Sequence, residues 1–213
     1  LAGRAGLIRR RENGSHFDTF VHRVVYALTS PMGEVIGFGG RVIDADGAKG
    51  AEAKVDQPKY KNSPETLIFK KGENLFGMHL AKHAIRRTGR ALVVEGNFDV
   101  MTLHQVGVDY AVAPQGTAMT AEQVKLLKRF AREVVLMLDA DPAGRAATMK
   151  VVHLFVEAEL PCRIAQLRAL GGKKQDPDEL ARKDLPKLLA LIDDAQDAVE
   201  FYFEQVASTS APT

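Results

Sequence analysis

The sequence lacks several features that would point to particular classes of protein. It has no Trp and one Cys, Cys162, so an internal disulfide framework and a cysteine-based zinc ribbon are excluded. No apolar run approaches the roughly 20 residues that a membrane-spanning helix needs, and no signal-peptide pattern is present at the start. The motif G-x-x-x-x-G-K-[ST] is also absent, which excludes a P-loop nucleotide site.

The residues that are present describe an ordinary globular chain. Of the 213 residues, 46% are hydrophobic and 26% are charged, enough for one large domain or two small ones. The sequence begins at Leu1 without an initiator Met, so we expect an excised segment of a longer protein.

The small net charge of +2 conceals an asymmetry along the chain. Residues 1–94 hold 16 Lys and Arg against 9 Asp and Glu, whereas residues 95–213 hold 13 against 18. A basic front half suits the phosphates of a nucleic acid, and an acidic back half suits metal ions. An unevenly charged solvated surface would give the same numbers, so charge alone leaves both interpretations open.

The first part of the chain is predicted to be rich in β-structure. Residues 21–28 and 35–43 are apolar, β-prone runs on either side of a turn signal, Ser30-Pro31-Met32-Gly33, which is typical of a hairpin. The glycines of the second run suggest close approach of another backbone or a ligand. Residues 44–58 predict a mobile loop, and Asn74 to Arg87 has helical spacing with a basic last turn.

From Ala91 onward, short apolar runs alternate with helical patterns. This alternation predicts an α/β fold with right-handed crossovers and a parallel sheet flanked by helices. We expect strands at 91–95, 109–113, 133–139 and 162–167, helices at 98–106, 120–131, 143–158 and from about 177, and tail helices near 186–192 and 195–206.

Carboxylates follow the predicted strands in three groups: Glu95 and Asp99, Asp139 and Asp141, and Asp176 and Asp178. Ligands of open α/β sheets bind at the carboxyl ends of the strands, so we expect Glu95 and Asp139 to meet at one edge. Hard divalent ions such as Mg²⁺ take oxygen ligands and share them with substrate phosphates. The pattern therefore indicates phosphoryl or nucleotidyl transfer.

Helix capping is a second interpretation of most of these carboxylates. Asp141-Pro142 and Asp176-Pro177 are good helix starts, with Asp as N-cap and Pro at the first helical position. Glu179 gives the second start a spacing that resembles a capping box, and Asp99 would lie in a first helical turn, where acid is favourable. Capping leaves Asp139 unexplained, because it comes directly after five apolar residues.

Three further patterns are weaker indications of function. Gly116-Thr117 follows a predicted strand, where its N–H groups would face a phosphate or form a plain turn. The Asp139 and Asp141 pair also matches aspartyl-phosphate phosphatases, although that family usually has Thr or Val where Ala143 stands. The histidines His79 and His83 are four residues apart, but nothing nearby completes a zinc site.

Four motifs together resemble the TOPRIM domain of bacterial DNA primases: Glu95 to Val100, Gly116 to Thr120, Asp139 to Arg145, and Asp176 to Asp178. The segments around Arg23, Gly37 to Arg41 and Pro58 to Thr66 are similar to the basic subdomain that precedes TOPRIM in the primase catalytic core. The last of these segments is specific to primases, and the resemblance covers about residues 5–205.

The resemblance implies three parts. Residues 1–88 would be part of a mixed α+β basic subdomain that binds template or nucleotide, residues 89–184 the TOPRIM metal-binding domain, and residues 185–213 a C-terminal helical segment. Primases usually have an aromatic residue where Asn97 stands and Gly where Ala140 stands. Neither departure removes a carboxylate, so we expect the metal site to survive.

The resemblance also implies roles for individual residues. Catalysis would depend on Glu95, Asp139 and Asp141, and Mg²⁺ or Mn²⁺ would be held by these three with Asp99 and Asp178. Contacts with the template strand or with nucleotide phosphates would come from Arg23, Arg41, Lys59, Tyr60 and Asn62.

The expected function is metal-dependent synthesis of short RNA primers on single-stranded DNA in the cytoplasm, from ribonucleoside triphosphates. Zinc is expected only in a separate N-terminal domain, contact with the replicative helicase only through a separate C-terminal domain, and no membrane is involved. Two alternatives stay open. A TOPRIM nuclease would use the same carboxylates for hydrolysis, and a non-catalytic module would only bind single-stranded DNA.

Overall fold

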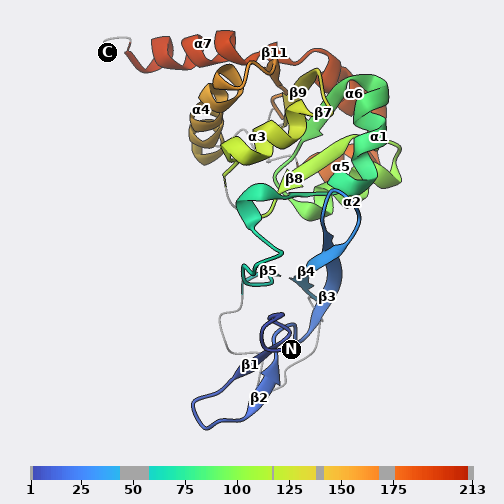
Figure 1. Cartoon of the computed structure of the whole chain (residues 1–213). Coiled ribbons are helices and arrows are strands. Elements are labelled where there is room, and N and C mark those ends of the chain that lie inside the picture. Colours follow the sequence, from blue (N-terminus) through green and yellow to red (C-terminus); the bar gives the residue numbers. More distant parts are fainter. Residues whose placement is uncertain (1, 44–57, 117, 138–141, 168–175, 211–213) are drawn as a thin grey trace. The chain divides into compact units, whose positions relative to one another are not determined.

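The computed structural model of the chain describes residues 2–43, 58–116, 118–137, 142–167 and 176–210. The chain divides into two compact units, residues 1–70 and 71–213 (Figure 1). Among the described helices, none combines the length and the apolar character that crossing a membrane requires.

The first unit contains two small antiparallel sheets. The strands β1 (Ile8–Arg10) and β2 (His16–Asp18) pair with each other. The second sheet has the order β3 (Arg23–Thr29), β4 (Val35–Val42) and β5 (Tyr60–Asn62). The predicted hairpin is confirmed, because β3 and β4 pair antiparallel across the turn at residues 30–34.

The glycines of β4 make room for side chains of the same unit. A Cβ at Gly39 would lie 2.3 Å from the ring of Tyr26, which faces it across the hairpin. A Cβ at Gly40 would lie 2.7 Å from the ring of Phe20. The expectation of an approaching ligand or second backbone is therefore wrong at these two positions, because aromatic side chains occupy the space.

The second unit is built on a six-stranded sheet with the order β11–β10–β9–β7–β8–β6. The strands are β6 (Leu75–Phe76), β7 (Arg90–Val93), β8 (Ala111–Pro114), β9 (Glu133–Leu136), β10 (Cys162–Ile164) and β11 (Gln196–Asp197). The four central strands are parallel, and β6 and β11 are antiparallel edges. The predicted parallel sheet is confirmed.

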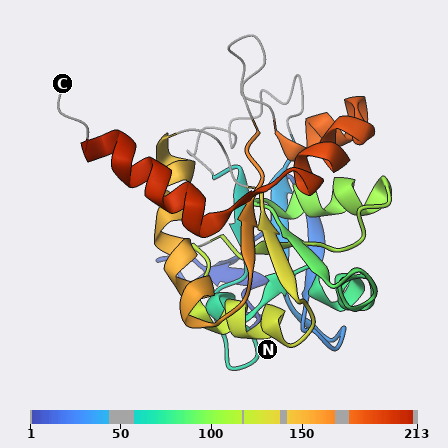
Figure 2. The same cartoon turned by 90° about the horizontal axis from the view of Figure 1, so that it is seen from above.

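Helices cover both faces of this sheet (Figure 2). They are α1 (Met78–Thr88), α2 (Asn97–Gln105), α3 (Ala121–Lys128), α4 (Pro142–Glu157), α5 (Pro177–Lys183), α6 (Leu185–Asp193) and α7 (Ala198–Ser210), with a 3₁₀ turn, η1, at Lys71–Glu73. Successive side chains of a strand point to opposite faces of the sheet, so the strands contribute to two separate cores. Val93 and Leu136 pack with α1, α3, α4 and α7, whereas Leu92 and Val135 pack with α2, α5 and α6.

Two elements differ from the sequence-based expectation. The helix predicted from Asn74 begins at Met78, because Leu75 and Phe76 pair with β8 and Gly77 takes a left-handed conformation with φ of 80°. The short edge strand β11 replaces the start of the helix expected from residue 195. The loop predicted at 44–58 lies outside the described residues except for its last position.

Candidate metal edge and nucleic-acid face

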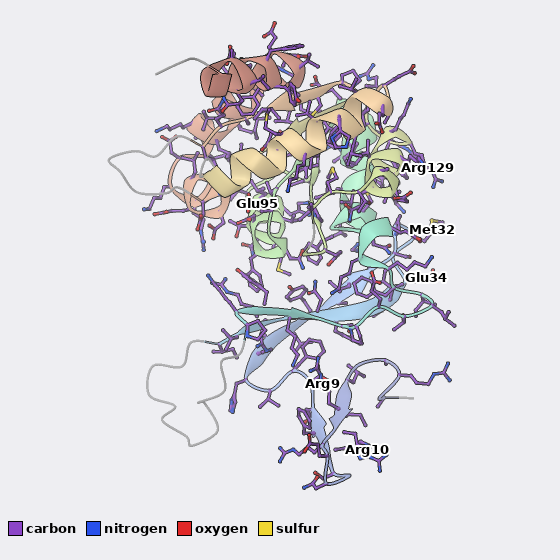
Figure 3. The ribbon with its side chains drawn as sticks, turned by 90° about the vertical axis from the view of Figure 1, so that its left-hand side faces the viewer. Arg9, Arg10, Met32, Glu34, Glu95 and Arg129 are labelled. Atoms are coloured by element: carbon purple, nitrogen blue, oxygen red, sulfur yellow. The ribbon has the colours of Figure 1, made fainter. Side chains whose placement is uncertain are left out.

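The carboxyl ends of β7 and β9 lie side by side in the second unit. Val93 is paired with Leu136, and the Met137 N–H donates to the Val93 carbonyl at 2.8 Å. Glu95 follows β7 at this edge and is exposed (Figure 3). The position predicted for Glu95 is thus observed, whereas Asp139 and Asp141 lie outside the described residues.

Asp99 lies in the first turn of α2 and stabilises its start. Its Oδ2 accepts a hydrogen bond from the Gly96 N–H at 3.0 Å. A carboxylate there also interacts favourably with the positive end of the helix dipole. The structural role considered for Asp99 is therefore present, and metal binding by this residue stays a prediction.

The carboxylates at the start of α5 are arranged differently from the expectation. Asp176 occupies the N-cap position, followed by Pro177, but its exposed carboxylate makes no capping hydrogen bond. Asp178 pairs with Arg182 one turn further on, and Glu179 pairs likewise with Lys183, so no capping box forms. Side-chain capping by Asp176 was thus wrongly expected.

Asp176 is a candidate ligand that the sequence interpretation set aside as a cap. The signal that could have found it is its spacing of two residues from Asp178, the same as between Asp139 and Asp141. The helix α5 packs against α2. The carboxylates at the start of α5, Asp176 and Asp178, and the one in the first turn of α2, Asp99, therefore belong to neighbouring helices on one face of the sheet.

The described carboxylates fit a hard cation in chemistry but do not complete a site for it. Their oxygen atoms are the ligands that Mg²⁺ and Mn²⁺ take. Within the described ranges, however, no group of three or more His, Cys, Asp or Glu side chains is close enough to hold a metal. The predicted ligands Asp139 and Asp141 lie outside these ranges, so a metal site at this edge stays a prediction.

A buried Gln fixes the turn that enters the second unit. The Nε2 of Gln123 donates to the carbonyls of Lys71 and Asn74, both at 2.9 Å, and its Oε1 accepts from the Thr120 N–H at 3.1 Å. In return the Thr120 Oγ1 accepts from the Gln123 N–H at 3.2 Å, completing a capping box. The nearby Gly116 has a φ of 82°. Thr117, for which a phosphate contact and a plain turn were both considered, is outside the described residues.

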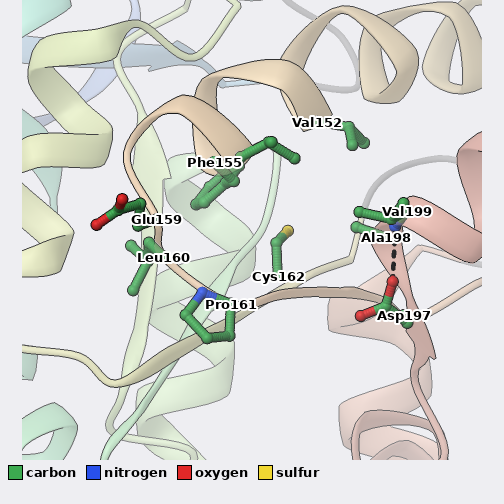
Figure 4. Close-up of a pocket in the computed structure, with 10 residues that line it drawn as sticks. Val152, Phe155, Glu159, Leu160, Pro161, Cys162, Asp197, Ala198 and Val199 are labelled. Carbon is green, nitrogen blue, oxygen red and sulfur yellow. Dashed lines mark hydrogen bonds between the residues drawn. The ribbon is translucent and has the colours of Figure 1, made fainter.

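An apolar pocket of about 260 Å³ lies between α4, β10 and α7 (Figure 4). Its lining includes Phe155, Cys162 and Val199. Burial raises the pKa of the Cys162 thiol, which keeps it protonated and unreactive. Asp197 is occupied as a cap, accepting hydrogen bonds from the N–H groups of Val199 and Glu200 at 2.8 and 3.2 Å. The pocket is therefore not a candidate for the chemistry.

In the first unit, four of the five predicted nucleic-acid contacts come together on one face. Arg41 on β4 is paired with Tyr60 on β5, and its guanidinium carbon lies 5.8 Å from the ring centroid. The Lys59 Nζ lies 5.7 Å from the same ring, which is 45% exposed. Asn62 is two residues from Tyr60 and shares its side of the strand. This face combines two cations with an exposed aromatic ring.

Arg23 is placed differently, with its guanidinium turned into the first unit. It is buried and donates to the carbonyls of Pro58 at 2.7 Å, Gly40 at 3.2 Å and Lys59 at 3.3 Å. Burial lowers its pKa from the ordinary value. The geometry favours a structural role, in which Arg23 holds the chain before β5 against β4.

Comparison with known proteins identifies the family. A Toprim-like family model matches residues 92–181, and the model of the DNA primase catalytic core, N-terminal domain, matches residues 1–82. The DNA primase of Clostridium acetobutylicum is 42% identical over 199 residues. The chain belongs to the bacterial DNA primase family. The match covers 92% of this chain, which spans about 30% of the length of that primase.

Solved primase structures confirm the TOPRIM-type α/β fold. The Aquifex aeolicus primase, with zinc-binding and RNA polymerase domains, has a TM-score of 0.79 and 37% identity, covering 91% of this chain and 45% of that one. A DnaG primase catalytic domain bound to single-stranded DNA has a TM-score of 0.85 and 35% identity, covering 99% and 66%.

Proposed function

We propose that this segment carries the metal-dependent chemistry of a primase, joining ribonucleotides into short RNA primers on single-stranded DNA. The observation that carries the proposal is the position of Glu95, at the carboxyl edge of a parallel sheet and beside the strand that leads to Asp139. A carboxylate in that place has a clear use in a primase core, because nucleotidyl transfer needs cations beside the triphosphate.

The proposed metal ligands are Glu95, Asp139 and Asp141, with Asp99, Asp176 and Asp178 as further carboxylates of the same edge. Bound Mg²⁺ or Mn²⁺ would supply charge stabilisation and lower the pKa of the attacking 3′-hydroxyl. The ion pair between Asp178 and Arg182 holds one of these carboxylates in place on α5. Both Glu95 and Asp176 are exposed residues at the surface of the second unit.

The proposed template contact is the face formed by Arg41, Lys59, Tyr60 and Asn62. Aromatic rings stack on bases of single strands, and neighbouring cations bind the phosphates. The related catalytic domain bound to single-stranded DNA supports this partner. Contact with the replicative helicase, and zinc binding, would belong to domains outside these residues.

The proposed parts are residues 1–88 for template and nucleotide binding, 89–184 for the metal site, and 185–213 as a helical segment. Each of the two family matches, at 1–82 and at 92–181, falls inside one of these parts.

The decisive experiment is Asp139→Asn, assayed by incorporation of labelled ribonucleotides on single-stranded DNA with Mg²⁺ or Mn²⁺. We expect the metal-dependent product to disappear while the fold and DNA binding persist, because the amide keeps the shape and removes the charge. Asp194→Asn, on an exposed Asp at the end of α6, is the matched control and should keep full activity. Undiminished synthesis by Asp139→Asn would refute the assignment. Metal-dependent nicking of a supercoiled plasmid without nucleotides would instead support a nuclease.

The template face is tested by Lys59→Ala in a salt titration of single-stranded DNA binding. We expect weaker binding at low salt and a log–log salt slope reduced by about 0.7, the value for one phosphate contact to a single strand. Lys187→Ala, on a partly exposed lysine of α6, controls for net charge. Equal slopes for Lys59→Ala and the parent chain would count against the face, and binding indifferent to metal and to Asp139 would favour a non-catalytic module.

A further inference from the structure

Three arginines gather at the opposite end of the sheet from the carboxylates: Arg86 in the last turn of α1, Arg129 at the end of α3, and Arg132 just before β9. All three are exposed. In the part of the chain that the structure describes, none of the three makes an ion pair with a carboxylate. We call this group the arginine patch.

Two neighbouring arginines behave differently. Arg87 pairs with Asp109 at 3.1 Å, and Arg90 pairs with Glu133 at 2.5 Å and with Asp193 at 2.7 Å. The same end of the sheet therefore has carboxylates within reach of some cations and leaves the arginine patch without them. A general shortage of acidic residues does not explain this, because residues 95–213 are acidic overall.

The guanidinium groups of the patch are held by packing. The guanidinium carbons of Arg86 and Arg129 lie 4.6 and 5.9 Å from the ring centroid of Phe130, which packs against the hydrophobic core. The Nε of Arg132 lies 2.6 Å from the point where a Cβ at Gly89 would be, so the glycine makes room for this side chain. Two like charges thus share the Phe130 ring, and a third lies beside Gly89, three residues along the chain from Arg86. Each guanidinium group has hydrogen-bond donors left for a ligand.

We propose that the arginine patch binds the phosphodiester backbone of single-stranded DNA, as a second contact surface remote from the metal edge. Guanidinium groups match phosphate geometry and stay charged at any working pH. The four residues of β7 separate the two ends of the sheet by on the order of 13 Å, at roughly 3.3 Å per residue. Figure 3 accordingly shows Glu95 and Arg129 on opposite sides of the second unit.

A nucleic-acid strand is favoured over an acidic peptide by what the patch offers. Its one aromatic ring, Phe130, is partly buried beside two guanidinium groups, which leaves charge and planar donors at the surface rather than a slot for an apolar side chain. The exposed Lys125, one turn before Arg129 on α3, extends the positive charge along the helix. The choice of DNA rests on the proposed function, since a primase holds a template strand.

The test is a triple variant of the 213-residue chain, Arg86→Gln with Arg129→Gln and Arg132→Gln, measured for binding to a 30-nucleotide single-stranded DNA from about 50 to 300 mM salt. We expect at least a tenfold loss of affinity at the lowest salt. The log–log salt slope should fall by about 2, because each lost contact to a single strand removes about 0.7. The matched control is Arg87→Gln, which removes an exposed but paired arginine and should change the slope by less than one contact.

Each outcome bears on the proposal. Unchanged affinity and slope in the triple variant would overturn it. The proposal would also be overturned if the parent chain bound a 20-residue poly-glutamate peptide more tightly than DNA and the triple variant lost this peptide binding. If the triple Gln variant does not fold, the triple Lys variant keeps the charge, and an intermediate loss with an unchanged slope supports the proposal. Lys59→Ala in the same assay tests the template face of the first unit separately. If Lys59→Ala leaves DNA affinity unchanged while the triple variant lowers it, the template face fails and the arginine patch stands.

Discussion

The two units of the chain are stabilised in different ways. Among the described residues that are hydrophobic and buried, Leu28 and Phe69 lie in the first unit and the others lie in the second. The interior of the first unit also holds polar groups, including Arg23 and Ser63, whose side chains bond to backbone atoms. In the second unit, two apolar layers enclose the sheet.

This difference has a functional side. Burial on both faces makes the central sheet a rigid support for carboxylates at one end and arginines at the other. The thin sheet of the first unit leaves Val24, Val25 and Tyr60 exposed, at 51%, 46% and 45%. Because successive side chains of a strand alternate, Val24 and Val25 lie on opposite faces, so both faces of this sheet are partly exposed, whereas the sheet of the second unit is covered on both.

The largest expected effect is on the core of the second unit. Leu92→Ala removes a fully buried side chain from the middle of β7 and should lower the free energy of unfolding by about 2–5 kcal/mol. Val25→Ala, on an exposed position of β3, is the control and should change it by about 0.5 kcal/mol or less. Urea unfolding with hydrogen exchange read separately for each unit checks this. A comparable loss at Val25 would break the comparison.

The sequence predicted the sheet of the second unit better than it predicted local conformation. Strand runs such as Val134 to Met137 are buried on both faces, so their apolar character alone located the parallel sheet and placed Glu95 at its edge. Local conformation was harder to predict. The left-handed Gly77 displaced the start of α1, and the ring of Tyr26 occupies the space over Gly39, a long-range contact that no short pattern encodes.

Individual side-chain roles at the site were predictable only in part, because they depend on which partner a charged group finds. Asp178 and Arg182 satisfy each other within one helix, whereas Asp176 takes the capping position without the capping bond. Arg23 has the right sequence context for a phosphate contact, yet three backbone carbonyls hold its guanidinium.

A smaller effect is expected for Gly39→Ala in the first unit. The new methyl group would lie 2.3 Å from the Tyr26 ring, so the ring must move, at a cost of about 1–3 kcal/mol. Protection of the β3 and β4 amides from hydrogen exchange should decrease, with no change in the second unit. At the control position, Gly3→Ala, the nearest atom would be 4.0 Å away, so we expect little change. Loss of protection in both units would show that they do not unfold separately.

The smallest effect concerns pH and the second unit alone. Burial lowers the pKa of His79 on α1, and the nearby Lys82 and His104 lower it further. The unfolded chain, with a His pKa of about 6.5, then binds more protons than the folded chain in the window just below that value. Stability should therefore be constant above about pH 6.5, decrease as the pH falls through this window, and level off below the folded pKa.

His79→Gln should flatten this decrease in urea unfolding measured between pH 5 and 7.5, whereas His83→Gln, on an exposed histidine of the same helix, should preserve it. A decrease that survives in His79→Gln would assign the acid sensitivity to other groups. Hydrogen exchange in the first unit should not follow the titration of His79, because this histidine lies on α1 in the other compact unit. If the first unit lost protection over the same pH range, the two units would share one unfolding transition. Their different cores would then not give them separate stabilities.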